Sequence, residues 1–155
     1  MEIRTPVRAT RTYTQRIQAP PERVLRLLCP VREAEWLERW DPSFVVTASG
    51  VAEADCVAVT GEGADEAVWV VTRHEPDAGF VEMLKVTPRV TACRIAIRLT
   101  ASPDGTDAEI TYTHTSLGPA GDEFVAAFDE AYYLEFMRDW ETRLNHYLAT
   151  GEMLR

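Results

Sequence analysis

The chain has 155 residues, of which 46% are hydrophobic and 26% are charged, and its formal net charge at pH 7 is −9. This composition predicts a single globular domain over residues 1–155 that is large enough to bury a core. The acidic balance, with 25 Asp and Glu against 16 Lys and Arg, argues against nucleic acid or an anionic membrane surface as a partner.

The sequence contains no recognisable targeting, membrane or cofactor motif. No stretch reaches about 18 consecutive apolar residues, and the first residues lack the apolar core of a signal peptide, so we expect a cytoplasmic protein. Cys29, Cys56 and Cys93 are widely spaced without a CxxC pair, which is typical of buried thiols in a reducing compartment. Motifs for nucleotides, metals and serine nucleophiles are missing, so we expect no cofactor and no metal.

The chain begins with a predicted strand and two short helices. Residues 8–18 alternate and contain Thr, Tyr and Ile, which is typical of a strand. Pro20 and Pro21 end this strand, and proline suits the first turn of a short helix that Pro30 then stops. Residues 32–39 predict a second short helix, which ends near Trp40.

Six apolar-rich segments separated by turn residues follow, and they predict an antiparallel meander. The expected strands cover residues 44–48, 55–60, 67–74, 79–86, 91–101 and 108–115. In the fifth of them, Arg94 and Arg98 share one face, whereas the opposite face is apolar and carries Cys93, Ile95, Ile97 and Leu99. We therefore expect a sheet with one apolar side and one solvated side.

Residues 121–150 contain no proline and predict one long helix. Its apolar stripe recurs at three- or four-residue steps and consists of Val125, Phe128, Tyr132, Phe136, Trp140, Leu144 and Leu148. This helix must cover the apolar side of the sheet, which makes the fold α+β. Because a twisted sheet curls around such a helix, a cavity remains wherever the two surfaces do not meet.

The element order and four segments resemble a known superfamily. The segments are RIQAPPERVLRLL, EWLERWDP, AVWVVTRHEP and ITYTHTSLGPAGDEFVAAF. Over residues 8–150 the chain resembles the START-like, polyketide-cyclase and birch-pollen-allergen superfamily, also called SRPBCC. The resemblance implies a helix-grip fold, in which a curved seven-stranded antiparallel sheet wraps around a long C-terminal helix and encloses a hydrophobic cavity. It implies no single activity, because some members carry apolar ligands whereas others catalyse cyclisation or dehydration.

The helix stripe and the strand alternation indicate which residues would bind a ligand in such a cavity. The expected set is Phe128, Tyr132 and Phe136 from the helix, Trp69, Met83, Ile97, Tyr112 and His114 from the strands, and Trp36 and Trp40 from the second short helix. The last two are spaced i, i+4, and would either frame an entrance or plug one end of the core.

Tyr112 and His114 are the candidates for catalysis. Residues two apart on a strand point the same way, so these two side chains would form an acid/base pair beside a bound ligand. Glu82 is a third strand residue able to move a proton, with the alternative that it sits on the solvated face.

Three functions of different classes remain open at this stage. The first is the binding or carriage of a small hydrophobic molecule of lipid, polyketide or aromatic type. The second is a cofactor-free enzyme of cyclase or dehydratase type that acts on a polyketide-like substrate. The third is a protein-interaction domain, with a homodimer as one possibility, whose cavity is filled by its own side chains.

Overall fold

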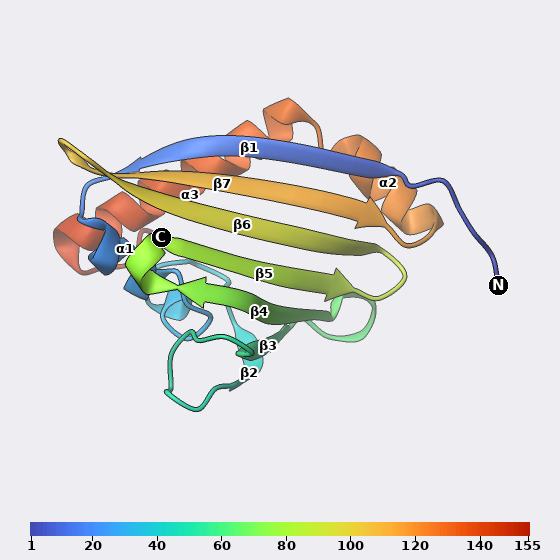
Figure 1. The fold of residues 1–155 in the computed structure, drawn as a ribbon, viewed down its shortest axis with the longest axis horizontal. Helices are drawn as coiled ribbons and strands as arrows, with labels where there is room; N and C mark the ends of the chain where they lie inside the picture. Colours follow the sequence, from blue (N-terminus) through green and yellow to red (C-terminus); the bar gives the residue numbers. More distant parts are fainter.

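The computed structural model describes residues 1–155 and contains one curved sheet with helices along its concave side (Figure 1). None of the helices is both long and apolar enough to span a membrane. In chain order the elements, with η for a 3₁₀ turn, are β1 (Arg8–Ile17), α1 (Pro21–Leu27), η1 (Glu33–Glu35), β2 (Pro42–Val46), β3 (Val57–Thr60), η2 (Gly63–Asp65), β4 (Ala67–Glu75), η3 (Pro76–Ala78), β5 (Phe80–Thr87), β6 (Thr91–Ser102), β7 (Gly105–Ser116), α2 (Pro119–Ala127) and α3 (Glu130–Thr150).

All seven strands form one antiparallel sheet in the order β1-β7-β6-β5-β4-β3-β2. Strands β6 and β7 pair over their whole length, from Thr91 opposite Ser116 to Ser102 opposite Gly105. Strand β1 lies beyond β7, so β1 and β2 are the two edges, and α1 and η1 connect them. This arrangement, with α3 running behind the sheet in Figure 1, confirms the predicted helix-grip α+β fold.

The two faces of the sheet follow the alternation of its sequence. On β6 the predicted apolar residues, Cys93 among them, are buried, whereas Arg94 and Arg98 are exposed. The buried face joins α1 and α3 in a single hydrophobic core, to which each large apolar side chain contributes about 1.5–3 kcal/mol. The three cysteines are free and buried, as their spacing predicted.

The predicted long helix is interrupted, and this is the main correction to the sequence-based fold. Helix α2 ends at Ala127, Phe128 leaves the helical conformation with ψ of 62°, and α3 begins at Glu130. Asp129 is the N-cap of α3, since its Oδ1 accepts a hydrogen bond of 2.8 Å from the backbone N–H of Tyr132. The break rotates α3, so Tyr133 rather than Tyr132 points toward the sheet.

The second short helix, expected over residues 32–39, is only the 3₁₀ turn η1. Side-chain bonds to distant backbone oxygens organise this segment in place of a helical ladder. The indole N–H of Trp36 donates to the oxygen of Leu27 at 3.0 Å, and that of Trp40 donates to Pro30 at 2.7 Å. Arg39 then adopts a left-handed conformation, with φ of 68°, as the chain turns toward β2.

The capping role of Asp129 predicts the direction in which its substitution changes stability. Asp129→Ala removes the acceptor for the Tyr132 amide and should lower the free energy of unfolding by about 0.5–2 kcal/mol in urea denaturation. Asp129→Asn keeps a capping oxygen and is the matched control, with little expected change. Were residues 121–150 one uninterrupted helix, alanine would be the better helix former and the substitution would raise stability instead.

Candidate functional site

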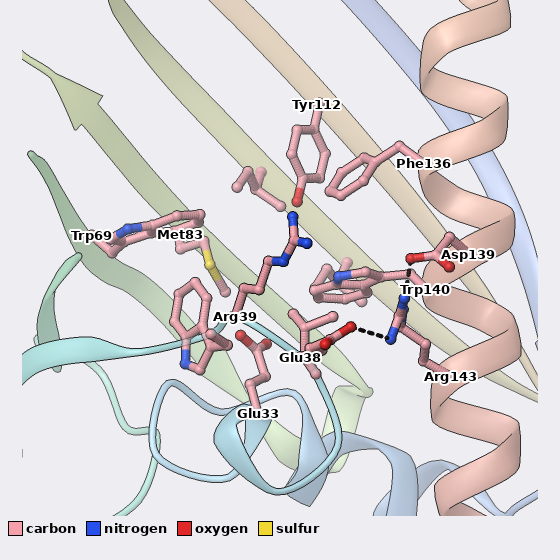
Figure 2. Close-up of a pocket in the computed structure, with 14 residues that line it drawn as sticks. Glu33, Glu38, Arg39, Trp69, Met83, Tyr112, Phe136, Asp139, Trp140 and Arg143 are labelled. Carbon is pink, nitrogen blue, oxygen red and sulfur yellow. Dashed lines mark hydrogen bonds and ion pairs between the residues drawn. The ribbon is translucent and has the colours of Figure 1, made fainter. Parts of the chain in front are cut away.

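A cavity of about 430 Å³ lies between the concave face of the sheet, α3, and the segment of residues 33–40 that begins with η1 and is called the η1 segment below (Figure 2). Its volume is within the range of about 300–1,000 Å³ that is usual for small-molecule sites. The hydrophobic residues that line it are Leu37, Trp40, Trp69, Met83, Ile95, Ile97, Tyr112, Phe136 and Trp140.

Aromatic rings in fixed positions form the walls. The rings of Trp40 and Trp69 meet edge to face at 5.2 Å, and Tyr112 meets Phe136 in the same way at 6.0 Å. The indole N–H of Trp69 donates to the Thr60 hydroxyl at 2.9 Å, as that of Trp40 does to Pro30. Both of these donors are therefore occupied within the protein, and the two indoles offer a ligand only their rings.

Glu33 places a carboxyl group in this apolar surrounding. Its backbone is held in the η1 turn, where its N–H donates to Cys29 at 2.8 Å and its carbonyl accepts from Leu37 at 2.8 Å. The residue is only 6% exposed, and its carboxyl has no hydrogen-bond partner in the protein. Burial raises the pKa of Glu33 from the usual 4.5 to about 8, so the group keeps its proton at neutral pH.

Tyr112 lies across the cavity from Glu33, on β7, where it faces Ile95 of β6 in the sheet register. Its hydroxyl points into the cavity (Figure 2). Burial raises the pKa of Tyr112 well above its usual value, and the nearby Cys93, Tyr133 and Glu33 add smaller contributions in the same direction. The phenol is therefore a neutral hydrogen-bonding group at any physiological pH.

Charged side chains occur at the rim. Arg143 of α3 lies 2.8 Å from a carboxylate oxygen of Asp139 and 3.5 Å from one of Glu38, which holds both acids in ion pairs. Arg39 has no such partner, and its guanidinium extends across the cavity toward the Tyr112 hydroxyl (Figure 2). The buried part of the cavity thus contains two neutral polar groups, Glu33 and Tyr112, whereas the exposed Arg39 and the paired carboxylates lie toward its opening.

Six of the residues expected from the sequence meet at this cavity, and they are Trp40, Trp69, Met83, Ile97, Tyr112 and Phe136. Trp36 does not line it. Its ring is fully buried and packs edge to face on Trp140 at 5.1 Å. Of the two alternatives considered for Trp36, the structure therefore corresponds to a plug in the core and not to the frame of an entrance.

His114 and Phe128 do not line the cavity and belong to an aromatic cluster beneath α2, in which the Tyr112 ring lies 6.0 Å from that of His114 and 6.4 Å from that of Phe128. The His114 ring packs on Phe124 at 4.8 Å and on Phe128 at 4.5 Å. Burial, together with the positive charge of Lys85, lowers the pKa of His114 to about 4, so the imidazole is neutral at pH 7. Its Nδ1 atom is buried without a hydrogen-bond partner.

Tyr132 is 55% exposed and faces away from the sheet. The cause is the break at Asp129, which shifts the inward position by one residue. Tyr133 takes that position, and its hydroxyl donates to the backbone oxygen of Ile110 at 2.6 Å. The expected contact of Tyr132 with a ligand between sheet and helix is therefore not available in this structure.

Sequence reasoning missed Glu33, whose carboxyl lies in the buried part of the cavity, and Arg39, an exposed residue that also lines it. One signal for Glu33 was present, because it lies three residues before Trp36 and four before Leu37, on the same side of a short amphipathic segment. A carboxyl group on an apolar face is unusual enough to mark a candidate site. No comparable pattern pointed to Arg39, whose direction depends on its left-handed backbone.

The raised pKa of Glu33 predicts how stability depends on pH. Between about pH 4.5 and 8 the folded protein retains a proton that the unfolded chain has lost, so wild-type stability should fall across this window. Glu33→Gln removes this loss, and its advantage over the wild type should grow to the order of a few kcal/mol by pH 8. Urea denaturation at pH 5 and 8 measures the difference, with the exposed Glu123→Gln as control. Parallel curves for wild type and Glu33→Gln would contradict the burial of an unpartnered carboxyl.

No protein-family model and no curated protein matches the sequence. Solved structures do match the fold. An uncharacterised protein from Rhizobium leguminosarum superposes with a TM-score of 0.66 at 18% identity, over 96% of this chain and 99% of that chain. Norcoclaurine synthase from Thalictrum flavum gives a TM-score of 0.66 at 9% identity, over 94% of this chain and 88% of that chain.

A third structure, DynU16 from the dynemicin biosynthetic locus, has a TM-score of 0.55 at 22% identity, over 95% of this chain and 48% of that chain. Identities this low establish a shared fold and leave activity open. By the architecture of its sheet and helices, the chain has a helix-grip fold, which is the fold that the resemblance noted in its sequence implies.

Proposed function

We propose that this protein binds a small hydrophobic ligand, of lipid, polyketide or aromatic type, in the cavity between the sheet and α3. The observation that carries the proposal is the cavity itself, with a volume of about 430 Å³ and walls formed largely by apolar and aromatic side chains. A cavity of this size also argues against the alternative of an interaction domain whose interior is filled by its own side chains.

The binding residues that we propose are those that both the sequence pattern and the cavity geometry indicate. Strands β4 to β7 contribute Trp69, Met83, Ile97 and Tyr112, whose side chains form the floor, while Trp40 and Phe136 flank them from the η1 segment and α3. Ring surfaces in such a site contribute affinity through burial of apolar area. Tyr132, His114, Phe128 and Trp36 are not part of this set.

A cofactor-free enzyme of cyclase or dehydratase type is the second candidate, and Glu33 favours it. A carboxyl with a pKa near 8, facing a phenol in an apolar cavity, has the properties of a general acid. In this proposal Glu33 and Tyr112 form the acid/base pair, and Glu33 takes the place of His114. The neighbours include one protein named as a synthase, so the fold is compatible with both binding and catalysis.

The two candidate functions predict different effects of Glu33→Gln on the turnover of a polyketide-like carbonyl substrate. In an enzyme the substitution should lower turnover by roughly 10²–10⁴-fold, because the amide has no proton to transfer, while ligand binding persists. In a carrier there is no turnover to lose. Turnover that is unaffected by the substitution would remove Glu33 from the chemistry.

Ligand affinity should depend on Phe136 if the cavity is the binding site. Phe136→Ala removes a ring from its wall and should weaken binding of the neutral dye N-phenylnaphthylamine about tenfold, the value of a partly buried aromatic contact. The matched control is Tyr132→Ala, an aromatic one turn earlier on α3 that faces solvent, and it should leave affinity unchanged. Fluorescence titration of the folded variants measures both, and equal affinities for wild type and Phe136→Ala would place the dye elsewhere.

A further inference from the structure

Four polar side chains that line the cavity can donate a hydrogen bond, and none of the four donates to a protein group. Tyr112 presents a hydroxyl, Arg39 a guanidinium and Glu33 a carboxyl that is protonated at neutral pH (Figure 2). Trp140 adds a fourth donor, since its indole N–H, unlike those of Trp36, Trp40 and Trp69, has no acceptor within the protein. These donor atoms face the open cavity, so a ligand that displaces water from them is favoured if it supplies an acceptor in exchange.

The acceptors that the chain itself places near the cavity are already engaged. Glu38 and Asp139 lie at the rim and share the guanidinium of Arg143. Deeper in, apart from Glu33 and Tyr112 themselves, the lining consists of aromatic rings and of aliphatic and thioether side chains, which supply no strong acceptor. An oxygen atom on the ligand is therefore the partner that the inner donors lack.

The charges of the protein indicate that the ligand is neutral. The whole chain carries a net charge of −9, which disfavours the approach of an anion. The charged side chains that line the cavity balance in sign, since Glu38 and Asp139 oppose Arg39 and Arg143, so an ionised ligand meets no net opposite charge there. A carbonyl oxygen accepts two hydrogen bonds without carrying a net charge.

We propose that the cavity selects a neutral, planar aromatic ligand that carries a carbonyl group, and that Tyr112 and Glu33 donate hydrogen bonds to the carbonyl oxygen. The planar shape follows from the walls, where the rings of Trp40, Trp69 and Phe136 offer flat apolar surfaces. This inference rests on the proposed ligand-binding function and adds to it the chemical class of the ligand.

The donor set makes carbonyl recognition depend on pH through Glu33. The groups that face Glu33 are Tyr112 from β7, Asp139 and Arg143 from α3, and Glu38 and Arg39 from its own segment. Tyr112 keeps its proton because its pKa is raised, whereas Glu33 loses its proton above about pH 8 and then becomes an acceptor. Selectivity for a carbonyl should therefore decrease as the solution becomes alkaline.

Fluorenone and fluorene are the probes that test this inference, because they are planar, neutral and nearly equal in size, and differ by one carbonyl oxygen. Displacement of N-phenylnaphthylamine from the wild type at pH 6.5 should show that fluorenone binds about tenfold more tightly. At pH 9 the preference should decrease to about threefold or less. Tyr112→Phe should reduce the preference about threefold to tenfold at pH 6.5.

Glu33→Gln is the matched variant for the pH effect, since its amide remains a neutral donor at both pH values. It should retain the preference for fluorenone at pH 6.5 and at pH 9. Equal affinities of the two probes in the wild type would overturn the inference while leaving hydrophobic binding intact. So would a preference that survives Tyr112→Phe, or one that does not decrease with pH in the wild type. If neither probe displaces the dye, the proposed function itself fails, and this inference fails with it.

Discussion

The attachment of α3 to β1 is the constraint on which the cavity depends. The buried Gln15 donates from its amide to the backbone oxygen of Met137 at 2.8 Å. About two turns farther along the helix, the Asn145 side chain donates to the backbone oxygen of Arg16 at 2.9 Å and accepts from the backbone amide of Gln18 at 2.8 Å. These bonds hold the helix along one edge of the sheet. A helix is only about 10–12 Å wide, so it leaves the concave surface of the central strands to be covered by the η1 segment.

That covering segment explains why a carboxyl group lies in the interior. The η1 turn is fixed by Trp36, whose ring is buried against Trp140, and by Trp40, whose indole is bonded to Pro30. Glu33 lies in the same turn and is carried inward with these anchors. Among the other buried polar residues, Gln15 and Thr106 donate to backbone oxygens, whereas the Glu33 carboxyl and the Nδ1 atom of His114 have no partner in the protein. A local conflict of this kind is typical of functional sites.

The parts of the fold that the sequence predicts are those fixed by local periodicity. On β6, buried residues such as Ile95 and Ile97 alternate with exposed ones such as Arg94 and Arg98. Because side chains on a strand point alternately to the two faces of the sheet, this pattern determines which face of the strand is buried. The break at Asp129 was not predictable in this way, because a charged residue off the apolar stripe is equally suited to an exposed helical position and to an N-cap. A shift of one residue then exchanged the environments of Tyr132 and Tyr133.

The candidate site was only half predictable for a related reason. Trp69, Met83 and Tyr112 lie on strands, and the side of the sheet that they face follows from alternation alone. Glu33 and Arg39 lie in a segment where tertiary bonds and one left-handed residue decide the directions of the side chains. Acidic residues are ordinarily exposed, so composition gave no reason to place Glu33 in the interior.

Binding and catalysis in this cavity would use the same residues. A neutral carboxyl donates a hydrogen bond to a carbonyl oxygen in the ground state, and it transfers its proton only if negative charge develops on that oxygen during a reaction. The pKa of about 8 makes Glu33 a donor in the first case and an acid suited to neutral pH in the second. On the proposed assignment, the difference between a carrier and an enzyme therefore lies in the reactivity of the bound molecule, and no second set of catalytic residues is needed.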